Sequence, residues 1–281
     1  MSAAHRMGES RYLSLDDGRR LHHRRAGTGA ATVVFESGMG FSSAAWGRVQ
    51  PAVAAHAATL VYDRAGIGRS EVDTAPRTLA RAAADLSQLL SSVAGPLVLV
   101  GHSWGGPIVR TVAAGGRFDV RGVILVDQSD ENVDAYFAPA VERRMSQTGP
   151  LFALAMRLSV TRLRAQATRG QSPEVAAELR RDLAVVAQTM GAELGDFLPA
   201  LRDLRAHPER MDPLRDLDVT VITGLRAGLT DRRQRSDLAH GHRLTAERLG
   251  ARRVAAPRSG HNVMFDEPDL LVREIVRSLP R

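Results

Sequence analysis

Short apolar runs alternate with helical patterns along most of the 281-residue chain. The runs are rich in Val, Ile and Leu and are not polar at every second position, which is typical of strands buried on both faces of a parallel sheet. We predict strands at Thr32–Glu36, Thr59–Tyr62, Leu97–Val100, Val123–Asp127, Val219–Thr223 and Arg253–Ala256. The segments between them predict helices at Ala44–His56, Thr78–Val93, Gly105–Ala114, Arg232–Leu249 and Pro268–Leu279.

Two short stretches before these strands predict a β-hairpin. Tyr12–Leu15 and Leu21–Arg24 flank Asp16-Asp17-Gly18, a sequence typical of a tight turn. With the six runs, the hairpin gives an eight-stranded sheet that is mostly parallel and antiparallel only at one edge. The alternation of strands and helices predicts an α/β fold with helices on both faces of this sheet.

One interval departs from the alternation, because no strand pattern occurs between Asp127 and Val219. Four helical stretches fill it, at Val133–Met145, Leu151–Thr168, Pro173–Met190 and Glu193–Arg205. A crossover between parallel strands needs only about a dozen residues. We therefore predict that residues 129–213 form an all-helical cap, or lid, inserted into a core domain made of residues 1–128 and 214–281.

The most specific motif is Gly101-His102-Ser103-Trp104-Gly105, which lies between a predicted buried strand and a predicted helix. Gly-x-Ser-x-Gly in that context is typical of a nucleophile elbow, a tight turn that holds the serine in a strained conformation above the sheet. The flanking positions must be small so that neighbouring backbone can pass, and glycine stands at both. We therefore predict that Ser103 is a nucleophile.

A serine hydroxyl is a weak nucleophile at neutral pH and needs a general base. His261 is the best placed of the nine histidines, since it follows the last predicted strand at the sheet edge where open α/β folds place their sites. His102 adjoins the serine but cannot reach it productively. His240 and His242 have no third ligand nearby, so we interpret them as surface residues and predict no metal site.

The base in turn needs a carboxylate that orients it. Asp127 ends a predicted strand at the same sheet edge, which favours it as this acid. Asp231 is the alternative acid, although it lies near a predicted helix start, where it could serve as an N-cap or first-turn residue. Asp130 is a third candidate. The residues favour Asp127 and leave the choice open.

Acyl transfer to a serine also needs hydrogen-bond donors for the oxyanion. The backbone N–H of Trp104, the residue after the serine, is one predicted donor. The other is the N–H of Met39 in the loop Ser37-Gly38-Met39-Gly40, where the glycines let the backbone turn inward. These two groups form the predicted oxyanion hole.

The motifs and their order along the chain resemble those of the α/β-hydrolase fold superfamily. The likeness covers nearly the whole sequence. Ser37-Gly38-Met39 looks like the family's His-Gly-x oxyanion loop, and Asp63–Ser70 is similar to its Asp-x-x-Gly-x-Gly-x-Ser stretch. Ser103 matches the elbow, and Gly260-His261 matches the late histidine. The resemblance implies a serine hydrolase with a helical cap, a Ser-His-Asp triad and no cofactor.

Two positions depart from the family pattern. Serine stands at position 37, where many members have histidine. The acid usually follows the strand that Val219–Thr223 resembles, but Gly224-Leu225-Arg226-Ala227 contains no carboxylate. Some members carry the acid one strand earlier, so the resemblance strengthens the choice of Asp127. Dehalogenases and epoxide hydrolases of this fold use Asp as the nucleophile, and the serine separates this chain from them.

Composition excludes several other classes of protein. Cysteine is absent and all 38 basic residues are arginine, which removes thiolate, Schiff-base lysine and phosphate-loop lysine chemistry. The net charge of +7 is spread along the chain and only 4% of residues are aromatic, so we expect no nucleic-acid partner. No apolar run approaches the ~18 residues that span a membrane, and the first ten residues do not resemble a secretory signal. We expect a cytoplasmic protein without membrane contact, as a monomer or homodimer.

We expect the site to cleave an ester-type bond in a carboxylic ester, a lactone or a thioester. The predicted lid carries apolar residues, some of which would line a hydrophobic pocket: Tyr136, Phe137, Met145, Phe152, Met156, Met190, Phe197 and Leu198. A small, mainly hydrophobic substrate is therefore the expected partner. The alternatives are C–C bond hydrolysis, amide hydrolysis or cofactor-free perhydrolysis on the same triad, or a non-catalytic ligand-binding or signalling member of the fold.

Overall fold

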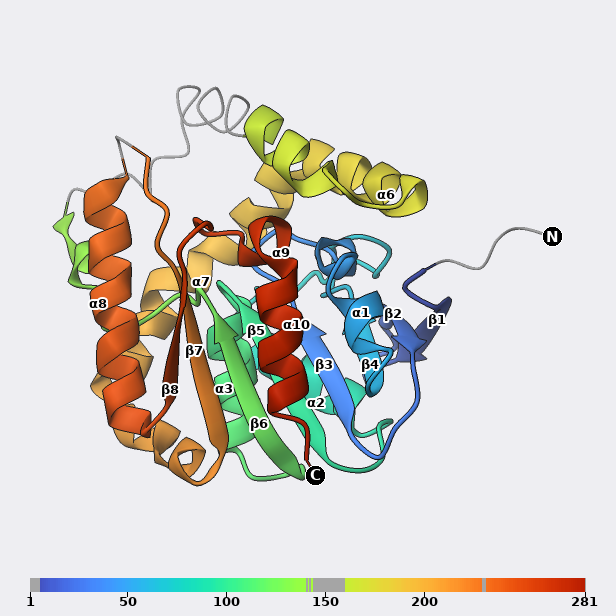
Figure 1. Cartoon of the computed structure of the whole chain (residues 1–281), viewed down its shortest axis with the longest axis horizontal. Helices are drawn as coiled ribbons and strands as arrows, with labels where there is room; N and C mark the ends of the chain where they lie inside the picture. Colours follow the sequence, from blue (N-terminus) through green and yellow to red (C-terminus); the bar gives the residue numbers. More distant parts are fainter. Residues whose placement is uncertain (1–5, 140, 142, 144–159, 229–230, 281) are drawn as a thin grey trace.

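The computed structural model describes residues 6–139, 141, 143, 160–228 and 231–280. Eight of the described segments form one sheet with the strand order β1-β2-β4-β3-β5-β6-β7-β8 (Figure 1). The strands are β1 Glu9–Ser14, β2 Arg20–Ala26, β3 Thr32–Glu36, β4 Ala58–Tyr62, β5 Leu97–His102, β6 Val120–Val126, β7 Asp218–Gly224 and β8 Arg252–Ala256. β2 pairs antiparallel with β1 and with β4, and the remaining pairs are parallel. The predicted mostly parallel α/β sheet is confirmed.

The central strands are apolar on both sides because each side faces its own core. Along β5, Leu97 and Leu99 belong to one buried cluster, whereas Val98 and Val100 belong to the other. The helices α2 Leu79–Leu90, α3 Gly105–Ala114 and α8 Arg232–Leu249 pack on the first cluster. The helices α1 Gln50–Val53, α9 Val263–Asp266 and α10 Pro268–Arg277 pack on the second (Figure 1). Helices therefore cover both faces, as predicted.

One predicted helix, Ala44–His56, is divided in the structure. The segment Ala44–His56 contains a 3-10 helix, η1 Ser43–Trp46, followed by the separate α1. Gly47 follows η1, and Pro51 stands in the first turn of α1, where proline favours the start of a helix. The sequence pattern detected the helical character but not this interruption.

The helical insertion between β6 and β7 is present in the described part of the chain. It contains η2 Asp134–Phe137, a helix over residues 160–168, α6 Pro173–Ala184, α7 Val186–Ala206 and η3 Pro208–Asp216. Part of the predicted helix Val133–Met145 and residues 151–159 of Leu151–Thr168 lie outside the described residues.

The predicted helix boundary at Gly191 is wrong. The chain leaves helical geometry at Val185 instead, and α7 continues through Gly191 and Gly195. A glycine costs a helix only about 1 kcal/mol relative to alanine. Burial of Leu201 and Leu204, further along α7, offsets that cost by anchoring the helix to the sheet.

The insertion contacts the core at two places. Val186 and Met190 of α7 approach Gly40, in the loop that follows β3. Leu201 and Leu204 belong to the same cluster as α2 and α3, so the carboxyl-terminal part of α7 packs on the core itself. The boundaries 129–213 of a separate cap domain stay a prediction.

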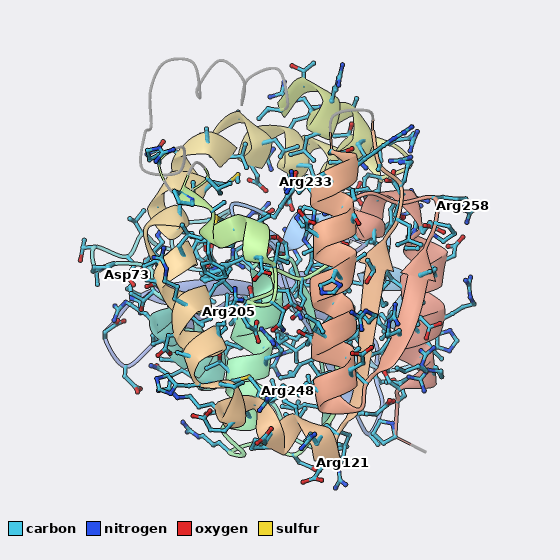
Figure 2. All side chains as sticks on the ribbon, turned by 90° about the vertical axis from the view of Figure 1, so that its left-hand side faces the viewer. Asp73, Arg121, Arg205, Arg233, Arg248 and Arg258 are labelled. Atoms are coloured by element: carbon cyan, nitrogen blue, oxygen red, sulfur yellow. The ribbon has the colours of Figure 1, made fainter. Side chains whose placement is uncertain are left out.

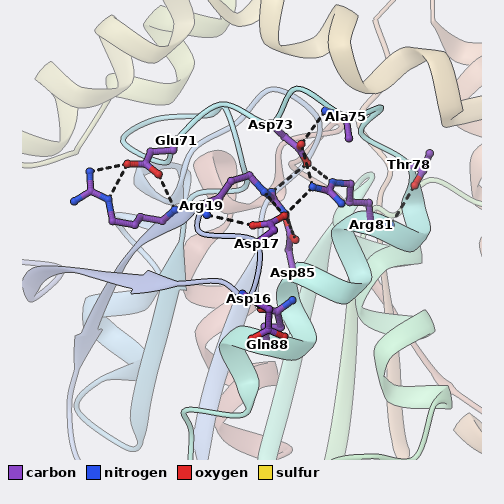
Figure 3. A network of polar contacts seen from close by, with 11 residues as sticks. Asp16, Asp17, Arg19, Glu71, Asp73, Ala75, Thr78, Arg81, Asp85 and Gln88 are labelled. Atoms are coloured by element: carbon purple, nitrogen blue, oxygen red, sulfur yellow. Dashed lines mark hydrogen bonds and ion pairs between the residues drawn. The ribbon is translucent and has the colours of Figure 1, made fainter.

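A network of ion pairs joins the β1–β2 hairpin to α2 (Figure 3). Arg19, after the hairpin turn, donates two hydrogen bonds to Asp85 of α2, at 2.7 and 2.8 Å. Arg81 of α2 donates to Asp17 in the turn and to Asp73. The network holds the antiparallel edge of the sheet against the helix layer.

Charged side chains point outward over much of the surface (Figure 2). Arg121, Arg205, Arg248 and Arg258 lie on different elements, and each pairs with a carboxylate within 3.3 Å. Each of these four positive charges is therefore balanced locally by a carboxylate. Among the described residues, no helix is long and apolar enough to cross a membrane.

Candidate active site

Ser103 lies in the tight turn between β5 and α3. Its φ of +51° is a left-handed conformation that residues with a side chain rarely adopt. A Cβ atom on Gly101 would lie 2.5 Å from the Gly105 carbonyl oxygen, and one on Gly105 would lie 2.6 Å from the Glu36 carbonyl oxygen. Both positions therefore require glycine, and the elbow has the geometry that its sequence predicts.

Three predicted site residues meet at the carboxyl edge of the sheet. The Ser103 hydroxyl lies 3.0 Å from His261 Nε2, and His261 Nδ1 lies 2.7 Å from Asp127 Oδ2. They come from the ends of β5, β8 and β6, which parallel pairing brings to one edge. The His261 side chain is 44% exposed, whereas Asp127 is fully buried.

Asp127 is held as a carboxylate. Burial would raise its pKa, but the hydrogen bond from His261 and the charge of the nearby Arg235 hold the pKa well below its ordinary value. The Gly224 N–H donates to Oδ1 at 3.0 Å, and Arg235 Nη1 donates to Oδ2 at 2.7 Å. Since an ionised carboxylate only accepts hydrogen bonds, His261 carries its proton on Nδ1 and leaves Nε2 free to accept the Ser103 proton.

The two predicted oxyanion donors border the serine. Trp104 occupies the N-cap position of α3. Gly38, just before Met39, packs so closely that a Cβ atom on it would lie 3.1 Å from Ser103 Cβ. Within the described residues, neither the Met39 nor the Trp104 N–H has a hydrogen-bond acceptor. Ser37, which replaces the family's histidine, accepts from Trp46 Nε1 at 3.0 Å and shapes this loop.

Residues 33–274 match the alpha/beta hydrolase family. The chain belongs to this family. The chain is 35% identical over 114 residues to protein YqjL of Bacillus subtilis, a match that covers 40% of this chain and 45% of YqjL. It therefore spans less than half of that relative's length.

Solved structures show the same fold. A hydrolase from Pseudomonas aeruginosa aligns with a TM-score of 0.68 at 23% identity, over 98% of this chain and 99% of that one. An esterase from Exiguobacterium antarcticum aligns with a TM-score of 0.68 at 17% identity, over 96% and 98% of the two chains. The resemblance inferred from the motifs is thus confirmed at the level of family and fold.

Arg235 is a site residue that the sequence did not indicate. It comes from α8, is buried, and shares Oδ2 of Asp127 with His261. It also approaches the Gly224 carbonyl oxygen at 3.4 Å. The sequence has many arginines, several of them beside Arg235 in α8, so no local pattern distinguishes this one.

His102 and Glu267 support the loop that carries His261. His102 Nε2 lies 3.0 Å from the His261 carbonyl oxygen, and the two rings are 4.8 Å apart. Burial lowers the pKa of His102 to about 3, so its ring is neutral and Nε2–H donates to that carbonyl. Glu267 accepts from the Ser259 hydroxyl at 2.7 Å and from the Arg258 N–H at 2.9 Å. His102 thus acts on the backbone of the base rather than on the serine.

The other candidate acids, Asp231 and Asp130, have other surroundings. Asp231 occupies the N-cap position of α8, but its side chain makes no capping bond there. In the described residues, it makes no hydrogen bond to His261. Asp130 accepts from Thr245, Asn132 and Gln128 instead.

Our interpretation of His242 as a surface residue is wrong. It is 1% exposed, with Nδ1 2.8 Å from Thr223 Oγ1 and Nε2 2.9 Å from the Gln128 carbonyl oxygen. The face of α8 that carries His242 packs on β7, which explains the burial. Within the described ranges, no group of three or more His, Asp or Glu residues is arranged to hold a metal ion.

Aromatic side chains from the insertion pack beside the elbow. The Phe197 ring lies 5.5 Å from Trp104 and 5.4 Å from Tyr136, centre to centre. Leu198 is buried in the core, while Tyr136, Phe137 and Met190 are partly buried against it. Met145, Phe152 and Met156 lie outside the described residues. The apolar character expected of the lid is present at these positions, and their contact with substrate stays a prediction.

Proposed function

We propose that this hydrolase cleaves an ester-type bond through an acyl-enzyme on Ser103, with His261 as the general base and Asp127 as the orienting acid. The observation that carries the proposal is the hydrogen-bonded chain of 3.0 and 2.7 Å that links Ser103 through His261 to Asp127. Nucleophile, base and orienting carboxylate within hydrogen-bond reach are the arrangement that acyl transfer to serine requires.

In the first step, His261 Nε2 takes the Ser103 proton while Oγ attacks the substrate carbonyl carbon. The carbonyl electron pair moves to the oxygen, which becomes an oxyanion. Asp127 stays ionised and stabilises the imidazolium, because its pKa lies well below that of a free carboxyl group. The buried Asp127 therefore supplies orientation and charge, and accepts no proton.

The oxyanion receives hydrogen bonds from the Met39 and Trp104 N–H groups, whose lack of other acceptors in the described structure supports this role. His261 then donates its Nε2 proton to the leaving oxygen or sulfur, and the acyl group remains on Ser103. A water molecule gives a proton to Nε2 and attacks the acyl carbon. Collapse of the second oxyanion releases the acid and returns the proton to Ser103.

The substrate we propose is a small, mainly hydrophobic carboxylic ester, lactone or thioester. The aromatic series Trp104, Phe197 and Tyr136 beside Ser103 supports an apolar acyl or alcohol group. The half-exposed His261 allows water to reach the base for the second step.

Comparing bond types tests the proposal. The full chain is given a series of esters with graded acyl chains, a vinylogous diketone and a prolyl amide, and product is measured for wild type and Ser103→Ala. We expect the esters to be hydrolysed fastest and the substitution to remove turnover. Faster cleavage of the diketone or amide would reassign the bond type, and tight binding without any turnover would favour a non-catalytic role.

A further inference from the structure

A buried arginine lies against the loop that carries Met39. Arg64, which follows β4, is 5% exposed. It donates to the carbonyl oxygens of Ser37 at 2.5 Å and Gly38 at 2.9 Å. It also donates to Glu36 Oε1 at 2.5 Å, and burial raises the pKa of that carboxyl group. The guanidinium thus joins the end of β3 to the loop after it.

The other partner of Arg64 comes from the insertion. Glu193, on α7, is 2% exposed and accepts from Arg64 Nε at 2.7 Å and Nη2 at 3.1 Å. Glu193 Oε2 also accepts from the Gly40 N–H at 2.9 Å. One carboxylate of α7 therefore binds both the loop and the arginine that holds the loop.

These bonds fix the two peptide groups on either side of Met39. The Gly38–Met39 peptide is planar and trans, so its C=O and N–H point in opposite directions. Arg64 binds the Gly38 carbonyl, which makes the Met39 N–H point away from the guanidinium. Glu193 binds the Gly40 N–H and fixes the next peptide. The direction of the Met39 N–H is thus set by an arginine of the core and a glutamate of the insertion.

We propose that Arg64 and Glu193 are positioning residues for the oxyanion, so that a complete oxyanion hole depends on α7 being packed in place. The inference rests on the proposed function, since it concerns the Met39 donor of that site. Buried charges are costly unless paired with good geometry. Glu193 binds Arg64 and the Gly40 N–H only while α7 is packed in place, so displacing α7 removes this carboxylate from both the arginine and the loop.

The test compares Glu193→Gln with Glu178→Gln as the matched control. Glu178, on α6, is also a buried carboxylate of the insertion, and it accepts from Arg24 at 2.7 Å and Arg69 at 2.6 Å. In the described structure, these two arginines make no hydrogen bond to residues 37–40. Both substitutions weaken an ion pair between insertion and core, but only the first presents an amide N–H₂ to Arg64 or to the Gly40 N–H.

Each enzyme is given an ester and the matching thionoester, whose sulfur accepts amide hydrogen bonds poorly. We expect Glu193→Gln to lower kcat for the ester about 10- to 100-fold at nearly constant KM, because a misplaced oxyanion donor weakens only the transition state. The thionoester rate should change little. Glu178→Gln should keep the ester-to-thionoester ratio of wild type. Partial unfolding would lower both rates together, so the ratio separates positioning from stability.

Three results would overturn the inference. The first is that Glu193→Gln has the same ester-to-thionoester rate ratio as the wild type. The second is that Glu178→Gln lowers this ratio as much as Glu193→Gln does. If Glu193→Gln does not fold, Glu193→Asp keeps the charge, retracts the carboxylate by one methylene and should lower the same ratio. A wild type that hydrolyses no ester is the third result, and it would overturn the proposed function as well.

Discussion

Replacing Asp127 by asparagine keeps the size of the side chain but removes its charge and one acceptor. If the amide oxygen takes the Oδ1 position, it still accepts from the Gly224 N–H. The amide nitrogen then faces Arg235 Nη1 and His261 Nδ1–H, which are both donors. The opposite orientation presents the nitrogen to the Gly224 N–H. Neither orientation gives each of these donors an acceptor. His261 then carries its proton on Nε2, so that Nε2 no longer accepts a hydrogen bond from Ser103.

The size of the effect follows from the bonds that change. A hydrogen bond to a charged group contributes about 1.5–3 kcal/mol, and a buried donor without an acceptor costs about 1–3 kcal/mol. Together they amount to about 2.5–6 kcal/mol, which corresponds to a roughly 10²- to 10⁴-fold fall in kcat. Arg235 also loses its buried counter-ion, so the free energy of unfolding should fall by about 3–5 kcal/mol.

The assay is the steady-state hydrolysis of a chromogenic ester by wild type, Asp127→Asn and Asp231→Asn. Circular dichroism establishes that each variant is folded at the assay temperature. Asp231→Asn is the matched control, and we expect it to retain the kcat of wild type. A folded Asp127→Asn enzyme with more than about a tenth of the wild-type kcat would refute the reasoning, since a reversed tautomer costs at least a hundredfold on the figures above.

Three further predictions concern the packing and protonation of the site. Gly105→Ala should destabilise the fold by about 1–3 kcal/mol, because the new Cβ atom would overlap the Glu36 carbonyl oxygen, and an unchanged urea midpoint would contradict this. Gly195→Ala should instead stabilise the protein by about 1 kcal/mol in urea unfolding, because alanine favours the helix α7 and its Cβ atom would meet nothing within 4 Å. A destabilised Gly195→Ala variant would refute this. The pKa of His102 is lowered to about 3 from an ordinary 6.5, so its contribution to stability is complete above about pH 6.5 and is lost as the pH falls toward 3. Between pH 6.5 and pH 5, the free energy of unfolding of wild type should therefore fall about 2 kcal/mol more than that of His102→Gln, and parallel pH profiles would exclude this explanation.

Much of the sheet was predictable because burial on both faces leaves a continuous apolar signal. β3, α3 and α8 begin and end where the sequence predicts. β6 ends one residue earlier than predicted, at Val126, because Asp127 adopts a φ of +41° that ends the extended conformation. Hydrophobic pattern alone contains no information about such a turn.

The candidate site was predictable where its residues lie next to local landmarks. Ser103 stands in the Gly-x-Ser-x-Gly turn, and Asp127 and His261 follow strands whose ends meet at one edge. Arg235, His242 and Glu193 have no such landmark, since their partners lie far away in the sequence. Their roles arise from the packing of α7 and α8 on the core, which a single sequence does not encode as a local pattern.

Reaction with a fluorophosphonate probe shows whether Ser103 is an activated nucleophile, on which the proposed function depends. The 281-residue protein and its Ser103→Ala variant are treated side by side, and the intact mass of each is measured. We predict one adduct on the wild type and none on the variant. A folded wild type without an adduct, or an adduct that persists after Ser103→Ala, would mean that Ser103 is not the activated nucleophile.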